Sequence, residues 1–243
     1  MKHLKTLTAL LASASLVGMV DAAPIAVTGY NTDIIAEGSA AIGTATSGGV
    51  IAGQEWTLAA TGYTGAGTLS GTPLPVVADT VTTDSGTVYA VDPDANNALV
   101  NDGTLTLVTP GQYEELQFLL FMVSNDFTAT VNFSDASTTE LSETGIGDWQ
   151  GPNSLNAFAA SSNAEEISAV RRSNGQLITL NPRELIFSLS PADQAKTITS
   201  IDIDFSSNSR GSIFGISGTV VPEPSSLALL SLGGLMIARR RRG

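Results

Sequence analysis

The sequence predicts an all-β protein whose main part is an antiparallel, jelly-roll-like β-sandwich. First, many short apolar runs are separated by turn-forming pairs such as Gly-Gly, Ser-Gly, Asp-Gly and Thr-Pro. Second, several stretches alternate apolar and polar residues, as half-buried strands do. Third, helical patterns are scarce. An N-terminal signal peptide and a short C-terminal transmembrane helix are predicted outside this domain, within a chain of 243 residues.

Residues 1–22 have the regions of a secretory signal peptide. A basic start precedes an apolar stretch, with Lys2, His3 and Lys5 followed by Leu7–Val20. Small residues then predict cleavage between Ala22 and Ala23. Cleavage one residue later would place the Pro24 ring directly after the bond. The alternative is a permanent N-terminal anchor.

The domain is predicted to span residues 23–220, roughly 200 residues, which is enough for a core of its own. In Phe127–Phe133 and Thr199–Phe205, apolar and polar residues alternate, which predicts half-buried strands. Leu116–Val123 is apolar on both faces, so we expect a central strand with both faces covered. Leu185–Leu189 and Ile213–Val220 complete these strands.

Two short helices are expected. Ser190–Gln194 has a capping serine followed by proline at the first helical position. Ala164–Val170 is the second expected helix.

Charge and composition exclude several functions. The chain has a net charge of −12; without the six basic and two acidic residues of its ends, five basic and 21 acidic residues remain, a net charge of −16. Such a surface repels nucleic acid. The chain has no Cys, and its single His is His3. The domain therefore offers no disulfide, Ser-His-Asp triad or His-rich zinc site.

The C-terminal end has three parts. Pro222, Glu223 and Pro224 form a stiff, extended peptide, because each proline fixes φ and restricts the preceding residue. Ser225–Ala238 is apolar or small and forms a helix of about 21 Å, shorter than the ~30 Å bilayer core. A basic cluster follows, consisting of Arg239, Arg240, Arg241 and Arg242. The positive-inside rule places this cluster on the cytoplasmic side.

The segment "VPEPSS", the Leu/Gly-rich helix and the terminal Arg cluster resemble the PEP-CTERM sorting signal of Gram-negative bacteria. The resemblance covers residues 221–243. It implies a membrane exosortase that recognises Pro222-Glu223-Pro224 and removes the tail, and a host that makes exopolysaccharide. The other implied partners are the secretion machinery, signal peptidase and, before processing, the inner membrane. The alternative is a tail-anchored protein with a chance motif.

The stretch from Asn96 to Val220 is similar to exported bacterial β-sandwich domains that include carbohydrate-binding types. The stretches "NNALVNDGTLTL", "YEELQFLL", "GDWQGP" and "KTITSIDIDF" carry this resemblance. It implies a fold more than a ligand.

Asp148, Trp149 and Gln150 are candidate sugar-binding residues. A tryptophan in a Gly/Pro-containing loop stacks on sugar rings, while neighbouring polar groups bind hydroxyls. The alternative is a tryptophan that closes the edge of the sandwich. Trp56 is expected in the core.

Asp92, Asp94 and Asn96 are candidate calcium ligands, because their oxygens occupy alternate positions. However, Asn97 stands where an EF-hand loop has glycine, and Gly103 stands where it has glutamate. A calcium site of another type and a plain Asp/Asn turn are the two interpretations. No other cofactor is expected.

Neither carboxylate pair in the domain favours catalysis. Glu114 and Glu115 are adjacent and should point to opposite faces of a strand, while Asp202 and Asp204 should face solvent. We therefore expect a non-enzymatic envelope or matrix protein that is structural or binds polysaccharide. A glycan- or peptide-acting hydrolase using carboxylates is the rival hypothesis.

Overall fold

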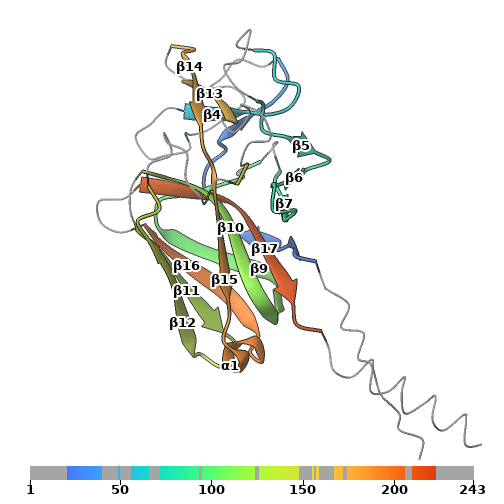
Figure 1. The fold of residues 1–243 in the computed structure, drawn as a ribbon, viewed down its shortest axis with the longest axis vertical. Coiled ribbons are helices and arrows are strands. Elements are labelled where there is room, and N and C mark those ends of the chain that lie inside the picture. Colours follow the sequence, from blue (N-terminus) through green and yellow to red (C-terminus); the bar gives the residue numbers. More distant parts are fainter. Residues whose placement is uncertain are drawn as a thin grey trace, which may run out of the picture.

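The computed structural model describes residues 21–39, 49, 56–65, 72–92, 95–123, 126–147, 155, 157–158, 167–171, 174–205 and 210–222. These residues form β-strands in four sheets and one short helix, α1 (Pro191–Gln194). Two five-stranded sheets make up the sandwich, and the two smaller sheets lie beyond it in Figure 1.

The first sheet of the sandwich, sheet A, consists of β1 (Ala23–Pro24), β8 (Leu99–Val100), β10 (Tyr113–Val123), β15 (Arg183–Ser188) and β17 (Arg210–Val220). The second, sheet B, consists of β2 (Val27–Thr28), β9 (Gly103–Gly111), β11 (Asp126–Phe133), β12 (Thr138–Thr144) and β16 (Ile198–Phe205). All strand pairs within these two sheets are antiparallel.

The chain passes repeatedly between the two sheets. From β8 on, the sandwich strands follow as β9, β10, β11, β12, β15, β16 and β17. The order in sheet A is β1-β17-β10-β15, with β8 also paired to β17, and the order in sheet B is β2-β9-β16-β11-β12. This alternation is the arrangement that the predicted jelly-roll-like sandwich requires. The structure is therefore nearly all β, as the sequence predicts.

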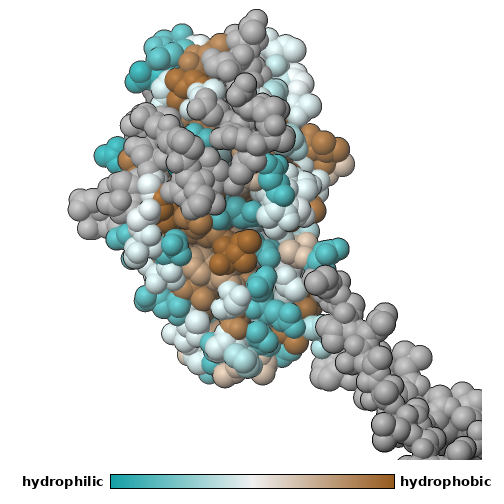
Figure 2. All heavy atoms as spheres, viewed as in Figure 1, coloured by the Kyte–Doolittle hydropathy of each residue, from teal (hydrophilic) through white to brown (hydrophobic). Residues whose placement is uncertain are grey.

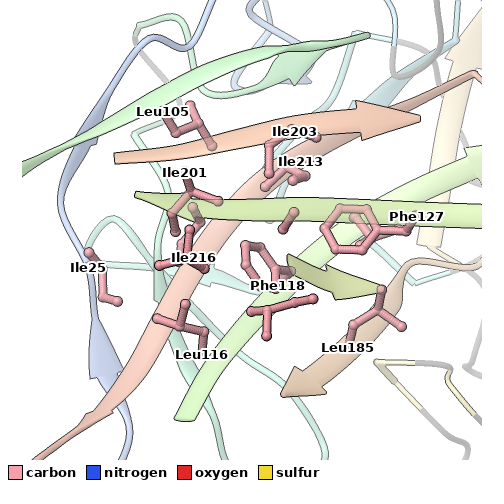
Figure 3. Packing of buried hydrophobic residues seen from close by; sticks show 14 of the residues in the cluster. Ile25, Leu105, Leu116, Phe118, Phe127, Leu185, Ile201, Ile203, Ile213 and Ile216 are labelled. Atoms are coloured by element: carbon pink, nitrogen blue, oxygen red, sulfur yellow. The ribbon is translucent and has the colours of Figure 1, made fainter. Parts of the chain in front are cut away.

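The main core lies between the inner faces of sheets A and B. Figure 3 shows side chains from both sheets meeting there, including Leu116, Phe118, Phe127, Ile201 and Ile216. Phe118 and Phe127 are fully buried, with ring centroids 5.3 Å apart. The alternation predicted for Phe127–Phe133 is confirmed, because Phe127, Ala129, Val131 and Phe133 point inward.

A second core covers the opposite face of sheet A. It is formed with two small sheets, one with β3 (Ile35–Ala36), β4 (Trp56–Ala59), β13 (Ile167–Arg171) and β14 (Leu177–Leu180), the other with β5 (Val76–Val77), β6 (Thr80–Thr82) and β7 (Val88–Ala90). Leu119, Phe121 and Phe214 of sheet A belong to this core. Trp56 is buried in it, as predicted.

One helix prediction is confirmed and one is wrong. In α1, the Ser190 side chain accepts a hydrogen bond from the Asp193 N–H, and Pro191 begins the helix. The expected helix at Ala164–Val170 is wrong where it can be compared, because Ile167–Arg171 is a strand paired with β4 and β14. β-branched Ile167 and Val170 and the two partner strands favour the extended backbone there.

In the described part of the chain, no helix has both the length and the apolarity needed to cross a membrane. Most of the predicted signal peptide, residues 1–20, and the predicted tail helix, Ser225–Ala238, lie outside the described residues.

Candidate functional site

The sorting tail begins directly at the end of sheet A. β17 pairs with β10 up to Val220, and the Val221 N–H then donates a hydrogen bond of 3.1 Å to the Gln112 carbonyl oxygen. Pro222 follows at once and is exposed. Since proline has no N–H and favours extended backbone in the residue before it, the pairing ends with Val221. Glu223, Pro224 and Arg239–Arg242 lie outside the described residues.

The predicted signal-cleavage site lies at the same end of sheet A. Ala23 is the first residue of β1 and pairs with Gly218 of β17, while Ala22 precedes it and is half-buried. Figure 1 shows β1 beside the end of β17 from which the chain leaves the domain. Ala23 and Pro222 therefore lie at the same end of sheet A.

Most of the predicted sugar and calcium ligands lie outside the described residues. Asp148, Trp149 and Gln150 lie outside the described residues, as does Asp94. Asp92 and Asn96 are both exposed. In the described ranges, no group of three or more His, Cys, Asp or Glu residues is placed to hold a metal ion.

The neighbouring Asn97 is the buried residue of this loop, and it has a structural role. Its amide nitrogen donates to Asp33 Oδ1 at 2.8 Å and to the Asp92 carbonyl at 3.2 Å, while its Oδ1 accepts the Ile34 N–H at 2.9 Å. These bonds join the loop to the segment before β3. The alternating Asp and Asn oxygens in the sequence could not distinguish this hydrogen-bonded loop from an ion-binding loop.

The outer face of sheet B is mainly polar, with Val108 as an exposed apolar residue on it. The pairing register places on this face Thr28, Thr104, Thr106, Asp126, Thr128, Thr130, Asn132, Thr138, Glu140, Ser142, Thr144, Ser200, Asp202 and Asp204. Asp202 accepts hydrogen bonds from Thr104 at 2.5 Å and from Asn132 at 2.8 Å. Asp202 and Asp204 are exposed, as predicted. The face offers hydroxyl, amide and carboxylate groups for hydrogen bonding.

The other carboxylate pair, Glu114 and Glu115, lies near the start of β10. Glu114 is the extra residue of a β-bulge opposite β17, whereas Glu115 accepts a 2.9 Å hydrogen bond from the Ser188 hydroxyl. Both side chains are half-buried.

A buried carboxylate that the sequence did not indicate lies between β15 and the small sheet. Glu184 Oε1 accepts hydrogen bonds from the Tyr89 hydroxyl at 2.8 Å and from the Thr83 hydroxyl at 2.9 Å. Burial raises the pKa of the Tyr89 hydroxyl above its ordinary value, and the Glu184 charge raises it further. Tyr89 therefore stays a neutral donor. Tyr89 and Thr83 precede Glu184 by about a hundred residues, so nothing local in the sequence marks Glu184 as a buried carboxylate.

Residues 220–242 match the PEP-CTERM protein-sorting motif. The chain thus carries this motif, as the resemblance of "VPEPSS" implied, and it is an exported protein whose motif implies exosortase processing. No curated protein matches the sequence.

Proposed function

We propose that this protein is a non-enzymatic component of the cell envelope or extracellular matrix of a Gram-negative bacterium. An exosortase sorts it by removing its C-terminal tail. One observation carries the proposal: the matched motif, residues 220–242, begins where β17 ends, so Pro222 emerges exposed from the folded domain.

The tail holds the chain in the membrane while the exosortase acts. Ser225–Ala238 enters the inner membrane, and Arg239–Arg242 stay at its cytoplasmic surface. After signal peptidase cuts between Ala22 and Ala23, this tail is the remaining anchor. The domain then lies against the membrane by the end where β17 leaves sheet A.

The β domain contributes a polysaccharide-associated surface, which the open face of sheet B supports. Its Thr, Ser, Asn, Asp and Glu side chains suit the hydroxyl groups of sugars. The register places no aromatic and no basic side chain on the described part of this face, so binding there would depend on hydrogen bonds. Trp149 is the candidate for stacking. The proposed role of the domain also includes calcium-dependent binding through Asp92, Asp94 and Asn96.

The alternative function is a secreted hydrolase that uses carboxylates. A general acid or base needs an oxygen directed toward a substrate. Both Asp202 oxygens accept hydrogen bonds from the sheet itself, and Glu184 Oε1 accepts two from neighbouring hydroxyls. These contacts favour the non-enzymatic proposal.

Replacing Pro222-Glu223-Pro224 with three alanines tests the sorting step. The full chain, expressed in an exosortase-containing host, should keep its tail, so its intact mass should stay that of the unprocessed form. Pro110→Ala, which changes another exposed proline, is the matched control and should be processed normally. Normal tail removal from the alanine variant would contradict the proposal.

Glycan-array binding with and without calcium tests the role of the domain. Binding that Trp149→Ala or Asp202→Asn weakens would support polysaccharide association. A negative array in both conditions would leave a scaffold or adhesin without a small ligand. Release of sugar products would support the hydrolase.

A further inference from the structure

The last residues of β17 have one paired side and one open side. On the β10 side, the Val221 N–H is bonded to the Gln112 carbonyl. On the other side, the Ile25 N–H donates to the Ile216 carbonyl, and Ala23 pairs with Gly218. Successive strand residues direct their backbone groups to opposite sides. The N–H and C=O of Val220 therefore point to the β1 side.

This side is open at Val220. β1 begins at Ala23, opposite Gly218, and within the described ranges no hydrogen bond to the Val220 backbone extends the pairing past that point. The Val220 side chain is 43% exposed. Cleavage after Ala22, as the sequence predicts, would leave no residue before Ala23 to cover this edge.

The open edge is continuous with the sorting motif. The matched segment starts at residue 220, inside β17. Pro222 and Pro224 have no N–H, and the Val221 N–H is already bonded within the sheet. Val220 is thus the nearest residue before the tripeptide with a backbone donor on the open side. Enzymes and binding domains commonly take extended peptides by adding a strand along such an edge.

We propose that the exosortase docks on this open edge, pairing with the backbone of Val220 while it takes hold of Pro222-Glu223-Pro224. The inference rests on the proposed function and adds a recognition residue and a docking surface to it. The folded sheet holds Val220 extended, directly before the tripeptide, which lowers the ordering cost of binding there. Tail removal is then fastest when the sheet is intact up to Val221.

Two matched proline variants with an intact tripeptide test this. Val220→Pro removes the N–H on the open side, whereas Val221→Pro removes the N–H that bonds to Gln112. In pulse-labelled cells, Val220→Pro should slow tail removal by about three- to tenfold, the effect of one lost hydrogen bond. Val220→Ala keeps the N–H and should be processed at nearly the normal rate. Slow processing of Val221→Pro with normal processing of Val220→Pro would overturn the inference.

A Gly-Ser-Gly-Ser insertion between Val221 and Pro222 gives an independent reading and leaves β17 unchanged. We expect slower processing, because the insertion separates the open edge from the tripeptide and the enzyme can no longer bind both at once. Faster processing would mean that the sheet hinders the enzyme, and an unchanged rate would mean that only the tail is read. Either result overturns the inference, while the proposed function stands as long as the triple-alanine variant keeps its tail. Thermal melting of each variant confirms that the domain is folded.

Discussion

Sheets A and B belong to one sandwich but differ in how many of their faces are covered. The middle of sheet A is buried on both faces, with Phe118 in the main core and Phe121 in the second core. Sheet B is buried on one face and open on the other, where Thr130 and Asp202 are not part of either core. The difference is visible in the sequence. A strand covered on both faces is apolar at neighbouring positions, whereas a strand covered on one face alternates apolar and polar residues.

The open face of sheet B also offers polar groups that a partner could bind. Figure 2 shows the molecule from the side seen in Figure 1, where teal and white residues are interspersed with brown apolar patches near the top, at the right edge and in the middle. The long exposed apolar side chains in the described ranges are few: Val77, Val108, Ile186 and Val220. A partner that recognises polar groups therefore has more surface to contact than one that needs an apolar groove.

The largest expected effects come from emptying either face of sheet A. Phe118→Ala and Phe121→Ala should each lower the free energy of unfolding by about 3–5 kcal/mol, because each ring is fully buried. Phe121 also stacks on Phe214, with centroids 5.1 Å apart. Thr130→Ala, on the open face of sheet B, should change it by less than about 0.5 kcal/mol. Urea unfolding of the tail-less domain measures all three.

The same experiment shows whether the two cores unfold together. Because β10 and β17 contribute to both cores, both phenylalanine variants should shift a single transition. A separate early transition in Phe121→Ala alone would contradict this shared role of sheet A.

An intermediate effect on stability is expected where sheet A meets the sheet of β5, β6 and β7. Tyr89→Phe removes one of the two hydroxyls bonded to the buried Glu184 Oε1, and it should destabilise the domain by about 1–3 kcal/mol. Tyr63→Phe is a suitable control, since Tyr63 is buried in a different cluster. Equal melting temperatures for Tyr89→Phe and the wild type would remove the structural role assigned to Glu184.

Much of the sandwich could be predicted from the sequence because its periods are simple. The alternation in Phe127–Phe133 and the stretch Leu116–Val123, which is apolar except for Gln117, identified a half-covered and a fully covered strand. The small sheets escaped prediction in detail, since β3 and β5 have two residues each and follow no period. The wrong helix at Ala164–Val170 had the same origin: pairing with β4, more than a hundred residues earlier, decided the structure.

The candidate sites divide in the same way. The tail could be predicted because its prolines, apolar run and arginines act locally, and the motif is confirmed. Asn97 and Glu184 could not, because their partners are distant in the chain. The sugar and calcium residues, Asp148–Gln150 and Asp92, Asp94 and Asn96, stay predictions.

The smallest effect concerns α1, which connects β15 of sheet A to β16 of sheet B. Hydrogen bonds from Lys196, at 2.8 Å, and from Ser190, at 2.7 Å, lower the pKa of Asp193 below its ordinary value. The stabilisation is therefore present above the pKa of the unfolded chain and is lost as the pH falls through the folded pKa. Asp193→Asn should melt slightly below the wild type at neutral pH, with the difference disappearing as the pH falls below the ordinary Asp pKa of about 4. A difference that grows in acid would contradict this assignment.

The intact mass of the exported protein tests the central claim most directly. The protein is purified from the envelope and medium of a host with an exosortase and from an otherwise identical strain without one. We expect the first product to start at Ala23 and to lack Arg239–Arg242, and the second to keep these arginines in the inner membrane. A mature product that still carries the arginine cluster in the exosortase-containing host would contradict the account.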